Sequence, residues 1–407
     1  MSTITYTQRR PSISLTGGDK AQAAPVPDGN GNDFTPPEFT IKDILDAIPK
    51  RCFERSLARS LSYVARDLVL VGILGGLATQ IHHIPYVWGR AIAWAAYTIC
   101  QGLVGTGLWV LAHECGHGAF SPYRLANDIV GWILHSSLFV PYHSWRISHS
   151  KHHKATGHLT RDMVFVPRDR ETYLKSRDIA ELVDEAPLAT VYFLIVQQLF
   201  GWPMYLLTNV TGQKYANVAK WKINHFWPSA PIFDKKDFWD IVISDIGIAA
   251  AVMGARMAIL RFGWQNFVLY YFIPYLWVNH WLVCITYLQH TDPTLPHYLA
   301  DEWTFARGAA ATIDRDFGFI GRHILHEIIE THVAHHFCSR IPFYHGEEAT
   351  QAIKKVMGTH YRRDSTNLIV ALYRIARTCQ FVEGPGAVKM YRNGNGIGVD
   401  AKDKKAE

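Results

Sequence analysis

The stretch AIAWAAYTICQGLVGTGLWVLAHECGH at residues 91–117 indicates the class of fold. Residues 91–112 carry no charge, and a helix of about 20 apolar residues is long enough to cross a bilayer. The stretch then ends in HECGH, in which His113 and His117 are four positions apart and so share one face of a helix. It therefore predicts a membrane-spanning helix that carries a pair of metal ligands at its end.

Three further apolar blocks, at 68–84, 241–260 and 265–287, are close to the length of a membrane span. The chain has 407 residues, of which 48% are hydrophobic, and a soluble protein of this length would usually form two or three domains. Here the apolar residues are concentrated in long blocks. We therefore expect an all-α polytopic membrane protein with about four transmembrane helices and a cytosolic histidine-rich cap, in one domain over residues 39–392.

The block 188–210 is ambiguous, because it is long enough to cross the membrane but a crossing there would separate two histidine clusters. The clusters at 149–153 and 332–336 would then lie on opposite faces, whereas clusters that build one site must share a face. Either this block is re-entrant or interfacial, or one of the later blocks does not span. Two glutamines and a proline inside the block favour the first alternative. The segment 127–141 is too short to cross and is expected in the membrane interface.

Residues 1–38 are polar and rich in Ser, Thr, Gly and Pro, so we expect a disordered tail. They lack the positively charged start and apolar core of a signal peptide. Thr40 followed by Asp43 then predicts the N-terminus of a helix over 41–48. The basic stretch 50–66 precedes the first span and marks the cytosolic side of the membrane.

Residues 393–407 are rich in Gly, Asn and Lys and are also expected to be disordered. Lys405 and Lys404 are the third and fourth residues from the end of this sequence. Lysines in these places match the di-lysine retrieval signal of endoplasmic-reticulum membrane proteins. A solvated charged tail explains the same residues, and the sequence leaves both explanations open.

Three histidine clusters indicate a metal centre: HECGH at 113–117, HSKHH at 149–153 and HVAHH at 332–336. On a helix, each cluster directs two or three imidazoles to one point. Eight neutral nitrogen ligands exceed the four that one zinc ion takes, so they suit two metal ions. Imidazole suits iron, copper or zinc. These eight residues are His113, His117, His149, His152, His153, His332, His335 and His336.

Buried metal ions with neutral ligands need anions and hydrogen bonds around the ligands. Four carboxylates near the clusters could serve or could equally lie at the surface: Glu114, Asp162, Glu327 and Glu330. A redox-active metal pair beside a bilayer suits the activation of oxygen against an unactivated C–H bond of a lipid chain. That reaction needs a rigid apolar tunnel and electrons from outside, since the chain has no flavin, haem or iron–sulfur motif. Thiolate at such a site is easily oxidised, which argues against Cys115 as a ligand.

The three clusters and their spacing resemble the membrane fatty acid desaturase family, acyl-lipid type. TYLQHTDPTLPHY at 286–298, THVAHHFCSRIPFYHGEEATQAIK at 331–354 and RDMVFVPRDR at 161–170 resemble the oleate (delta-12, omega-6) desaturases of plants and fungi. PPEFTIKDILDAIPKRCFERS at 36–56 and HECGHGAFS at 113–121 agree. The resemblance extends over roughly 36–380, nearly the whole folded chain.

This resemblance implies that the eight cluster histidines and a ninth, His290, bind two iron ions. It implies an enzyme that converts oleoyl to linoleoyl chains on membrane phospholipid in the endoplasmic-reticulum membrane, with its active site on the cytosolic face. It also implies O2 as co-substrate and electrons from cytochrome b5 and its NADH-dependent reductase. The chain has no HPGG motif of a fused cytochrome b5 domain, so the donor would be a separate protein. Eleven other histidines are expected to be structural or exposed: His82, His83, His135, His143, His158, His280, His297, His323, His326, His345 and His360.

Related activities stay open on the sequence alone. The same scaffold could make the omega-3 bond, make both bonds, or hydroxylate the chain. A membrane zinc hydrolase would use three histidines and an Asp, and a structural or transport protein could carry its histidines on a surface.

The formal charge of +6 is modest and suits a cytosolic membrane face, so we expect no nucleic-acid partner. The basic loops could dock an acidic electron carrier or face anionic lipid. They contain Lys151, Lys154, Arg161, Arg168, Arg170, Lys214, Lys220 and Lys222.

Overall fold

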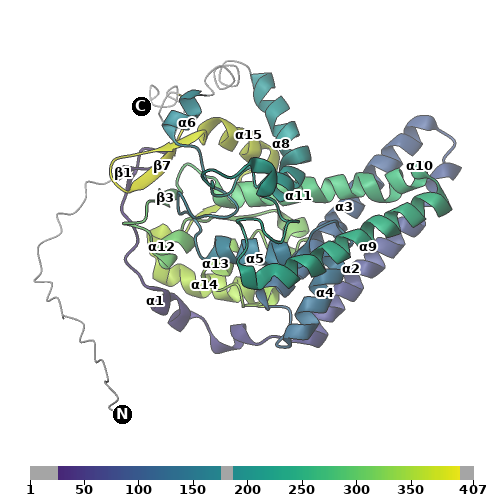
Figure 1. Ribbon diagram of the computed structural model, residues 1–407, viewed down its shortest axis with the longest axis horizontal. Helices are drawn as coiled ribbons and strands as arrows, with labels where there is room; N and C mark the ends of the chain where they lie inside the picture. The colour runs from purple at the N-terminus through teal and green to yellow at the C-terminus, as the bar shows by residue number, and fades with distance from the viewer. Residues whose placement is uncertain (1–25, 176–186, 395–407) are drawn as a thin grey trace, which may run out of the picture.

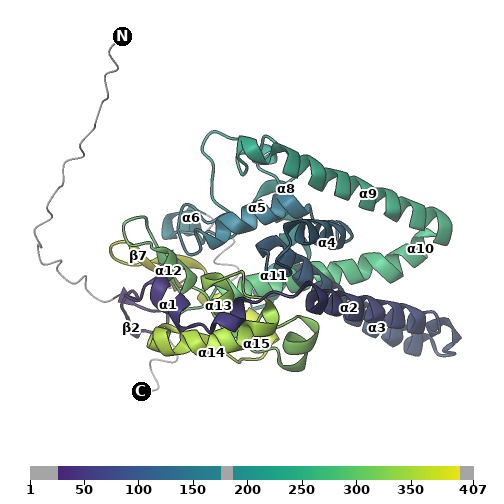
Figure 2. The same cartoon turned by 90° about the horizontal axis from the view of Figure 1, so that it is seen from below.

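The computed structural model describes residues 26–175 and 187–394 (Figure 1). Two long helical hairpins carry most of the apolar sequence. The first consists of α2 (Leu57–Ala78) and α3 (Val87–His117). The second consists of α9 (Phe238–Phe262) and α11 (Ile273–His290), joined through α10 (Trp264–Phe267) and the π-helical turn η5 (Val268–Phe272). Figures 1 and 2 show both hairpins turning at the same end of the molecule, far from the cap.

The expected all-α membrane fold is confirmed. Five helices are long and apolar enough to cross a membrane by length and composition: those four and α8 (Pro187–Thr208). Helix α3 is the most buried of them and packs against α2 and α11. Helices α2 and α9 instead expose apolar side chains along their length, as helices in contact with lipid do. These exposed side chains include Leu68, Val69, Ile73, Val252, Met253 and Met257.

Helix α8 covers the ambiguous block 188–210. It is one continuous helix with Pro203 inside it, so the block does not double back and the re-entrant alternative is wrong. Figure 1 shows α8 running across the direction of the two hairpins. It packs against α11 and α15 (Leu368–Thr378). This orientation favours an interfacial position, which stays a prediction.

Two shorter helices link the first hairpin to the rest of the chain: α4 (Arg124–Ser136) and α5 (Tyr142–His153). Helix α4 has 13 residues, too few to cross a bilayer, as expected for this segment. It packs against α3 and α9, and Trp132 donates its indole N–H to the carbonyl oxygen of Ile243 at 2.9 Å. Helix α5 also packs against α3 and α9, so the second histidine cluster comes close to the first.

The predicted helix at 41–48 is confirmed as α1 (Ile41–Ala47). Asp43 donates its backbone N–H to the Thr40 hydroxyl, and the Asp43 carboxylate accepts the Thr40 backbone N–H at 2.8 Å. This reciprocal capping box satisfies two backbone donors at the helix start. Buried Ile44 then fixes α1 on the cap, in one apolar cluster with Val333 and Ile353.

The cap contains α6 (Arg170–Lys175), α12 (Phe305–Ala309), α13 (His332–Phe337) and α14 (Gly346–Met357) around short strands. The strands are β3 (Pro296–Tyr298), β7 (Val388–Arg392) and β6 (Phe381–Glu383) in one antiparallel sheet, and β4 (Asp314–Arg315) parallel to β5 (Arg363–Asp364). Short helical turns occur in the cap and elsewhere. The cap contains η1 (Lys50–Phe53), η6 (Ile320–Ile324), η7 (Phe343–His345) and η8 (Gly358–His360). The turn η2 (Ile81–His83) joins α2 to α3, and η3 (Lys220–Lys222) and η4 (Lys235–Asp237) lie between α8 and α9.

The boundary of the N-terminal tail is wrong, because residues 26–38 are part of the fold. They form a small hairpin of β1 (Val26–Pro27) and β2 (Asp33–Phe34). Val26 and Phe34 are buried in one cluster with Tyr298 and Met390. These apolar residues are diluted in a polar stretch, so average composition conceals them. Residues 1–25 and 395–407, with the terminal lysines, lie outside the described residues.

Candidate metal centre

Nine histidines from four helices converge at one place where the hairpins meet the cap. These histidines lie in the last turn of α3, in the C-terminal half of α5, in the short helix α13 and at the last residue of α11. Helical spacing explains the local arrangement, since residues three and four apart share a face. The structure thus brings together every histidine that the sequence nominated as a metal ligand: His113, His117, His149, His152, His153, His290, His332, His335 and His336.

The first group contains His113, His117, His149, His153 and His335, whose ligand nitrogens all lie within 4.8 Å of one another. The Nε2 atom of His113 is 3.0 Å from that of His149 and 3.2 Å from that of His117. Two nitrogens bound at right angles to one ion, each about 2.1 Å from it, would be about 3.0 Å apart. The spacing therefore suits nitrogens that share one metal ion.

The second group contains His152, His290 and His336, again within 4.8 Å. His332 joins it, because its Nε2 atom lies 3.1 Å from that of His290. The Nε2 atoms of His335 and His336 are buried and have no hydrogen-bond partner within the described part of the chain. Buried polar atoms normally have partners, so two such nitrogens beside other converging imidazoles fit a metal centre.

Burial keeps these imidazoles neutral, which is the form that binds a metal ion. Desolvation, reinforced by neighbouring imidazoles, holds the pKa of His149, His153, His332, His335 and His336 well below the ordinary value of 6.5. The site therefore offers uncharged nitrogen donors at neutral pH.

Asp162 is the carboxylate that orients the second group. Its Oδ1 atom accepts from Nδ1 of His152 at 2.6 Å, which leaves Nε2 of that ring free for a metal. Backbone N–H groups of Val164 and Phe165 donate to the same oxygen at 2.9 and 3.2 Å and hold it in place. The sequence nominated Asp162, and the structure places it in this role.

Thr156 orients a second ligand in a similar way. Its hydroxyl donates to the carbonyl oxygen of His152 at 2.8 Å and so can accept from Nδ1 of His336 at 3.2 Å. Thr156 is not among the residues that the sequence pattern nominates, although it lies four residues after His152 on the chain. A hydroxyl within one turn of a ligand cluster is the signal that could have found it.

The other nominated carboxylates have mixed outcomes. Glu114 Oε1 lies 3.5 Å from Nδ1 of His113, and Oε2 accepts the backbone N–H of Phe343 at 3.0 Å. Glu330 instead accepts the backbone N–H of Phe317 at 3.0 Å. Glu327 follows His326 in a tight turn in which both residues have a positive φ. Cys115 is buried in an apolar cluster with Leu111 and Phe120, and it belongs to neither histidine group.

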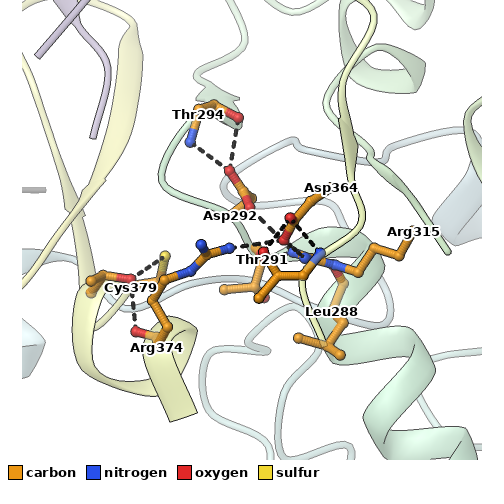
Figure 3. A network of polar contacts seen from close by, with 10 residues as sticks. Leu288, Thr291, Asp292, Thr294, Arg315, Asp364, Arg374 and Cys379 are labelled. Atoms are coloured by element: carbon orange, nitrogen blue, oxygen red, sulfur yellow. Dashed lines mark hydrogen bonds and ion pairs between the residues drawn. The ribbon is translucent and has the colours of Figure 1, made fainter. Parts of the chain in front are cut away.

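A buried arginine fixes the end of α11, where His290 lies (Figure 3). Arg315 donates from Nε to the carbonyl oxygen of Leu288 at 2.7 Å and from Nη2 to that of Thr291 at 3.3 Å. These two carbonyls flank His290 and would otherwise lack partners at the helix end. The side chain of Arg315 is only 2% exposed.

Two carboxylates hold the guanidinium of Arg315 in this position. Asp292 lies 3.2 Å from Nη2, and Asp364 lies 2.5 Å from Nη1. Arg374 also pairs with Asp364, at 2.8 Å, so the network links α11 to α15 (Figure 3). The position of His290 therefore depends on a charge network that the histidine spacing does not reveal.

Helix α13, which carries the third cluster, is held by Asp314. The carboxylate accepts the backbone N–H of Val333 at 2.8 Å and the hydroxyl of Tyr361 at 2.6 Å. Burial raises the pKa of Asp314 to about 7, and these two hydrogen bonds oppose that shift. The contact joins the N-terminus of α13 to β4, so the third cluster also depends on distant sequence.

An apolar cavity of about 140 Å³ borders both histidine groups. His113, His149, His152, His290 and His332 form one side of it. The aromatic side chains of Trp109, Trp145, Trp202 and Tyr205 form other walls, together with aliphatic residues of α11. The cavity lies between α3, α5, α8 and α11, so it joins the candidate metal centre to the helices that are long enough to span a membrane.

The remaining histidines lie outside both groups within the described residues. His326 is buried and pairs with Asp67 of α2 at 2.8 Å, and His135 approaches the carbonyl oxygen of Trp109 at 3.2 Å. His82, His83 and His323 are exposed. His225, which no sequence pattern singles out, is buried and contacts the Ser148 hydroxyl at 3.0 Å.

Comparison with known proteins agrees with this geometry. The model of the fatty acid desaturase family matches residues 91–367, which include all nine histidines. This chain belongs to the fatty acid desaturase family. The resemblance that the sequence motifs indicate is thus confirmed. The chain is an oxidoreductase, and its histidine cluster fits a metal site. A second model, of a domain of unknown function, matches residues 19–78 of this desaturase and includes the hairpin at 26–34.

Curated relatives cover most of this desaturase. A delta(12) fatty acid desaturase of Mortierella isabellina is 50% identical, over 88% of this chain and 91% of the relative. The delta(12)-fatty-acid desaturase of Arabidopsis thaliana is 43% identical, over 85% and 88%. An oleate hydroxylase of Claviceps purpurea is 48% identical, over 93% and 86%. Relatives with two different reactions are therefore about equally similar to this desaturase.

Proposed function

We propose that this desaturase is a delta-12 (omega-6) acyl-lipid desaturase. It inserts a second cis double bond into oleoyl chains of membrane phospholipid and so produces linoleoyl chains. The observation that carries the proposal is that both histidine groups border one apolar cavity. The names of the relatives from Mortierella isabellina and Arabidopsis thaliana support the position of the new bond.

The nine histidines hold two iron ions in this proposal. His113, His117, His149, His153 and His335 bind one ion. His152, His290, His332 and His336 bind the other. Nine imidazoles are more than one zinc ion can take, and imidazole suits iron. When bound, the two irons supply the oxidising chemistry that removes hydrogen from an unactivated C–H bond.

The protein's own residues position the ligands and the substrate. Asp162 fixes the tautomer and ring orientation of His152, and Thr156 does the same for His336. Trp109, Trp145 and Trp202 form rigid walls that exclude water and direct the acyl chain past the histidines. In the overall reaction the acyl chain loses two hydrogen atoms. O2 takes up these two hydrogen atoms, two electrons and two protons, and becomes two molecules of water. Cytochrome b5, reduced by its NADH-dependent reductase, supplies the electrons.

We place the enzyme in the endoplasmic-reticulum membrane with the histidine groups on the cytosolic side. The two hairpins support this arrangement, because both turn at the end away from the cap. The basic stretch at 50–66 leads into and includes the start of α2 at the cap end, as the positive-inside rule requires of a cytosolic side.

Hydroxylation of oleoyl chains is the second candidate function. The oleate hydroxylase of Claviceps purpurea favours it, since 93% of this chain aligns with that relative. Both reactions begin with removal of one hydrogen atom from the oleoyl chain. They differ in whether the oleoyl chain then loses a second hydrogen atom or gains an oxygen atom. The same residues serve both, so the product decides. Formation of an omega-3 bond, alone or as well, would likewise be seen in the product.

The test is expression in a yeast that makes oleate but no linoleate, followed by gas chromatography of fatty acid methyl esters. We expect a linoleate peak that His152→Ala abolishes. The matched control is His323→Ala, an exposed histidine outside both groups, which should leave the peak unchanged. A hydroxylated product would replace the first candidate by the second, and linolenate would indicate an omega-3 activity. An unchanged profile with the protein in the membrane would refute oleate as substrate.

A further inference from the structure

The segment that connects α8 to α9, together with the first two residues of α9, has an unusual surface. We call residues 214–239 the Lys/Trp loop, because the sequence there has five lysines, three tryptophans and only two acidic residues. The tryptophans Trp221, Trp227 and Trp239 are 60%, 50% and 70% exposed. The tryptophans of the cavity wall, in contrast, are almost fully buried. A soluble surface rarely exposes several large aromatic side chains together, so this surface indicates a partner.

The basic and aromatic side chains are interleaved. Lys220 and Lys222 flank Trp221 in the chain, and Nζ of Lys222 lies 5.1 Å from the centre of the Trp221 ring. The rings of Trp221 and Trp227 pack edge to face at 6.1 Å. Lys214, Lys235 and Lys236 are also exposed. Tryptophan and lysine together are typical of the headgroup level of a membrane.

The acidic residues of the loop do not cancel this charge. Asp237 is buried and caps the turn η4 with Asp234. Asp234 also lies 3.5 Å from Nζ of Lys151 and 3.9 Å from Nζ of Lys236. The remaining lysines therefore present a net positive surface.

The loop is anchored from behind, so its exposed side chains are held outward. His225 donates its backbone N–H to the carbonyl oxygen of Leu206 at 2.8 Å, and its ring contacts Ser148. Ile232 is fully buried, and Lys151 donates to its carbonyl oxygen at 2.7 Å. Helices α5 and α8 thus support the loop.

The loop also adjoins the cavity. The Tyr205 hydroxyl donates to Ser148 at 3.3 Å, and Tyr205 lines the cavity. Thr211, shortly before the loop, lines it too and donates to the carbonyl oxygen of Val164 at 2.6 Å. Both ends of the loop connect to helices that are long and apolar enough to cross a membrane. A lipid headgroup bound on the loop would therefore lie close to the cavity.

We infer that the Lys/Trp loop binds the headgroups of anionic phospholipids beside the cavity. The lysines pair with phosphate and carboxylate groups, and the tryptophans insert at the level of the glycerol backbone. An acidic electron carrier is the other partner that lysines could serve, but the exposed tryptophans favour lipid. The inference rests on the proposed function only in taking the cavity as the site of the acyl chain.

The test measures lipid binding without turnover. The full chain is reconstituted in phosphatidylcholine nanodiscs that contain traces of spin-labelled phosphatidylserine or spin-labelled phosphatidylcholine. Electron paramagnetic resonance then gives the fraction of each label that the protein immobilises. We expect the wild-type protein to prefer phosphatidylserine. In the double variant Lys220→Gln, Lys222→Gln, this preference should fall by about fivefold for each lysine replaced.

The matched charge control is Lys42→Gln with Lys355→Gln, two exposed lysines on α1 and α14 of the cap. It should keep the preference. Trp221→Ala should weaken lipid immobilisation, whereas Trp88→Ala, an exposed tryptophan at the start of α3, should keep the phosphatidylserine preference. All these residues are exposed, and unchanged metal content verifies that each variant is folded.

Loop variants that behave like the cap control would overturn the inference. So would an unchanged lipid preference combined with a higher Michaelis constant for an acidic electron-carrier domain, because the loop would then dock a protein. A chain that makes neither linoleate nor a hydroxylated product, but still prefers phosphatidylserine through this loop, would refute the proposed function and leave the headgroup site intact.

Discussion

Replacement of Arg315 by methionine tests whether the buried charge network positions His290. The substitution keeps the length of the aliphatic stem but removes the donors to Leu288 and Thr291 and the positive charge between Asp292 and Asp364. Asp292 is itself buried, so one carboxylate is left without its cation.

Removing one partner of a buried ion pair destabilises a protein by about 3–5 kcal/mol. Since a tenfold change corresponds to about 1.4 kcal/mol, the unfolding equilibrium constant should rise by about 10² to 10⁴. Arg322→Met is the matched control, because Arg322 forms an exposed ion pair with Asp316 at 2.9 Å. Such pairs contribute only about 0–1 kcal/mol.

The assay compares both variants in detergent by denaturant unfolding, with tryptophan fluorescence as the signal, and by metal analysis of the purified protein. Arg315→Met should unfold at a lower denaturant concentration and lose metal from the group that contains His290. Arg315→Lys should be intermediate, because it keeps the charge but not the planar fork that reaches several oxygens. If Arg315→Met matched Arg322→Met in both measurements, the network would not position His290.

Three further predictions concern the ligands, the cavity and pH. Asp162→Asn should reduce metal affinity about 10- to 100-fold, measured by competition with a chelator, whereas the exposed Asp169→Asn should not. Gly201→Val should lower the linoleate yield about tenfold at equal protein level, because a Cβ there already comes within 3.2 Å of Val283 in the cavity wall; an unchanged yield would mean that the acyl chain does not pass Gly201. The metal-free protein should become less stable as pH falls below about 6.5, because the buried imidazoles stay neutral in the folded protein and take up protons on unfolding. Each buried imidazole whose pKa is lowered should reduce the free energy of unfolding by about 1.4 kcal/mol per pH unit. Denaturant unfolding across this pH range measures that slope, and a flat profile would contradict the depressed pKa values.

The sequence predicts the local part of the site because helical spacing is a local property. The pairs and triplets within 113–117, 149–153 and 332–336 follow directly from residues three and four apart. His290 stands alone at the end of a span, so only the resemblance to known desaturases nominated it. Its place beside His332 depends on the tertiary fold.

The division into two groups could not be predicted. His152 and His153 are neighbours in the chain but belong to different groups, as do His335 and His336. Adjacent residues of a helix point about 100° apart, so neighbouring histidines naturally face different ions. Which neighbour faces which ion depends on how α3, α5, α11 and α13 pack.

Long-range contacts account for what the sequence reasoning missed. Arg315 joins α11 to Asp364, and Asp364 also pairs with Arg374. Both partners lie far from α11 in the chain, so no local sequence pattern predicts these contacts. Val26 and Phe34 enter the fold because Tyr298 of β3 and Val388 and Met390 of β7 offer an apolar surface to them. Helix α8 has the length and composition of a membrane span, and only its direction relative to the hairpins distinguishes it from one (Figure 1).

The most direct test of a two-iron centre is the metal content of the purified protein, measured by elemental analysis together with Mössbauer spectroscopy. We predict about two iron ions per chain, in keeping with two groups of histidines. His290→Ala should retain about one, because the group around His113 stays intact. One zinc ion per chain would contradict a two-iron centre, and two irons that survive His290→Ala unchanged would exclude His290 as a ligand.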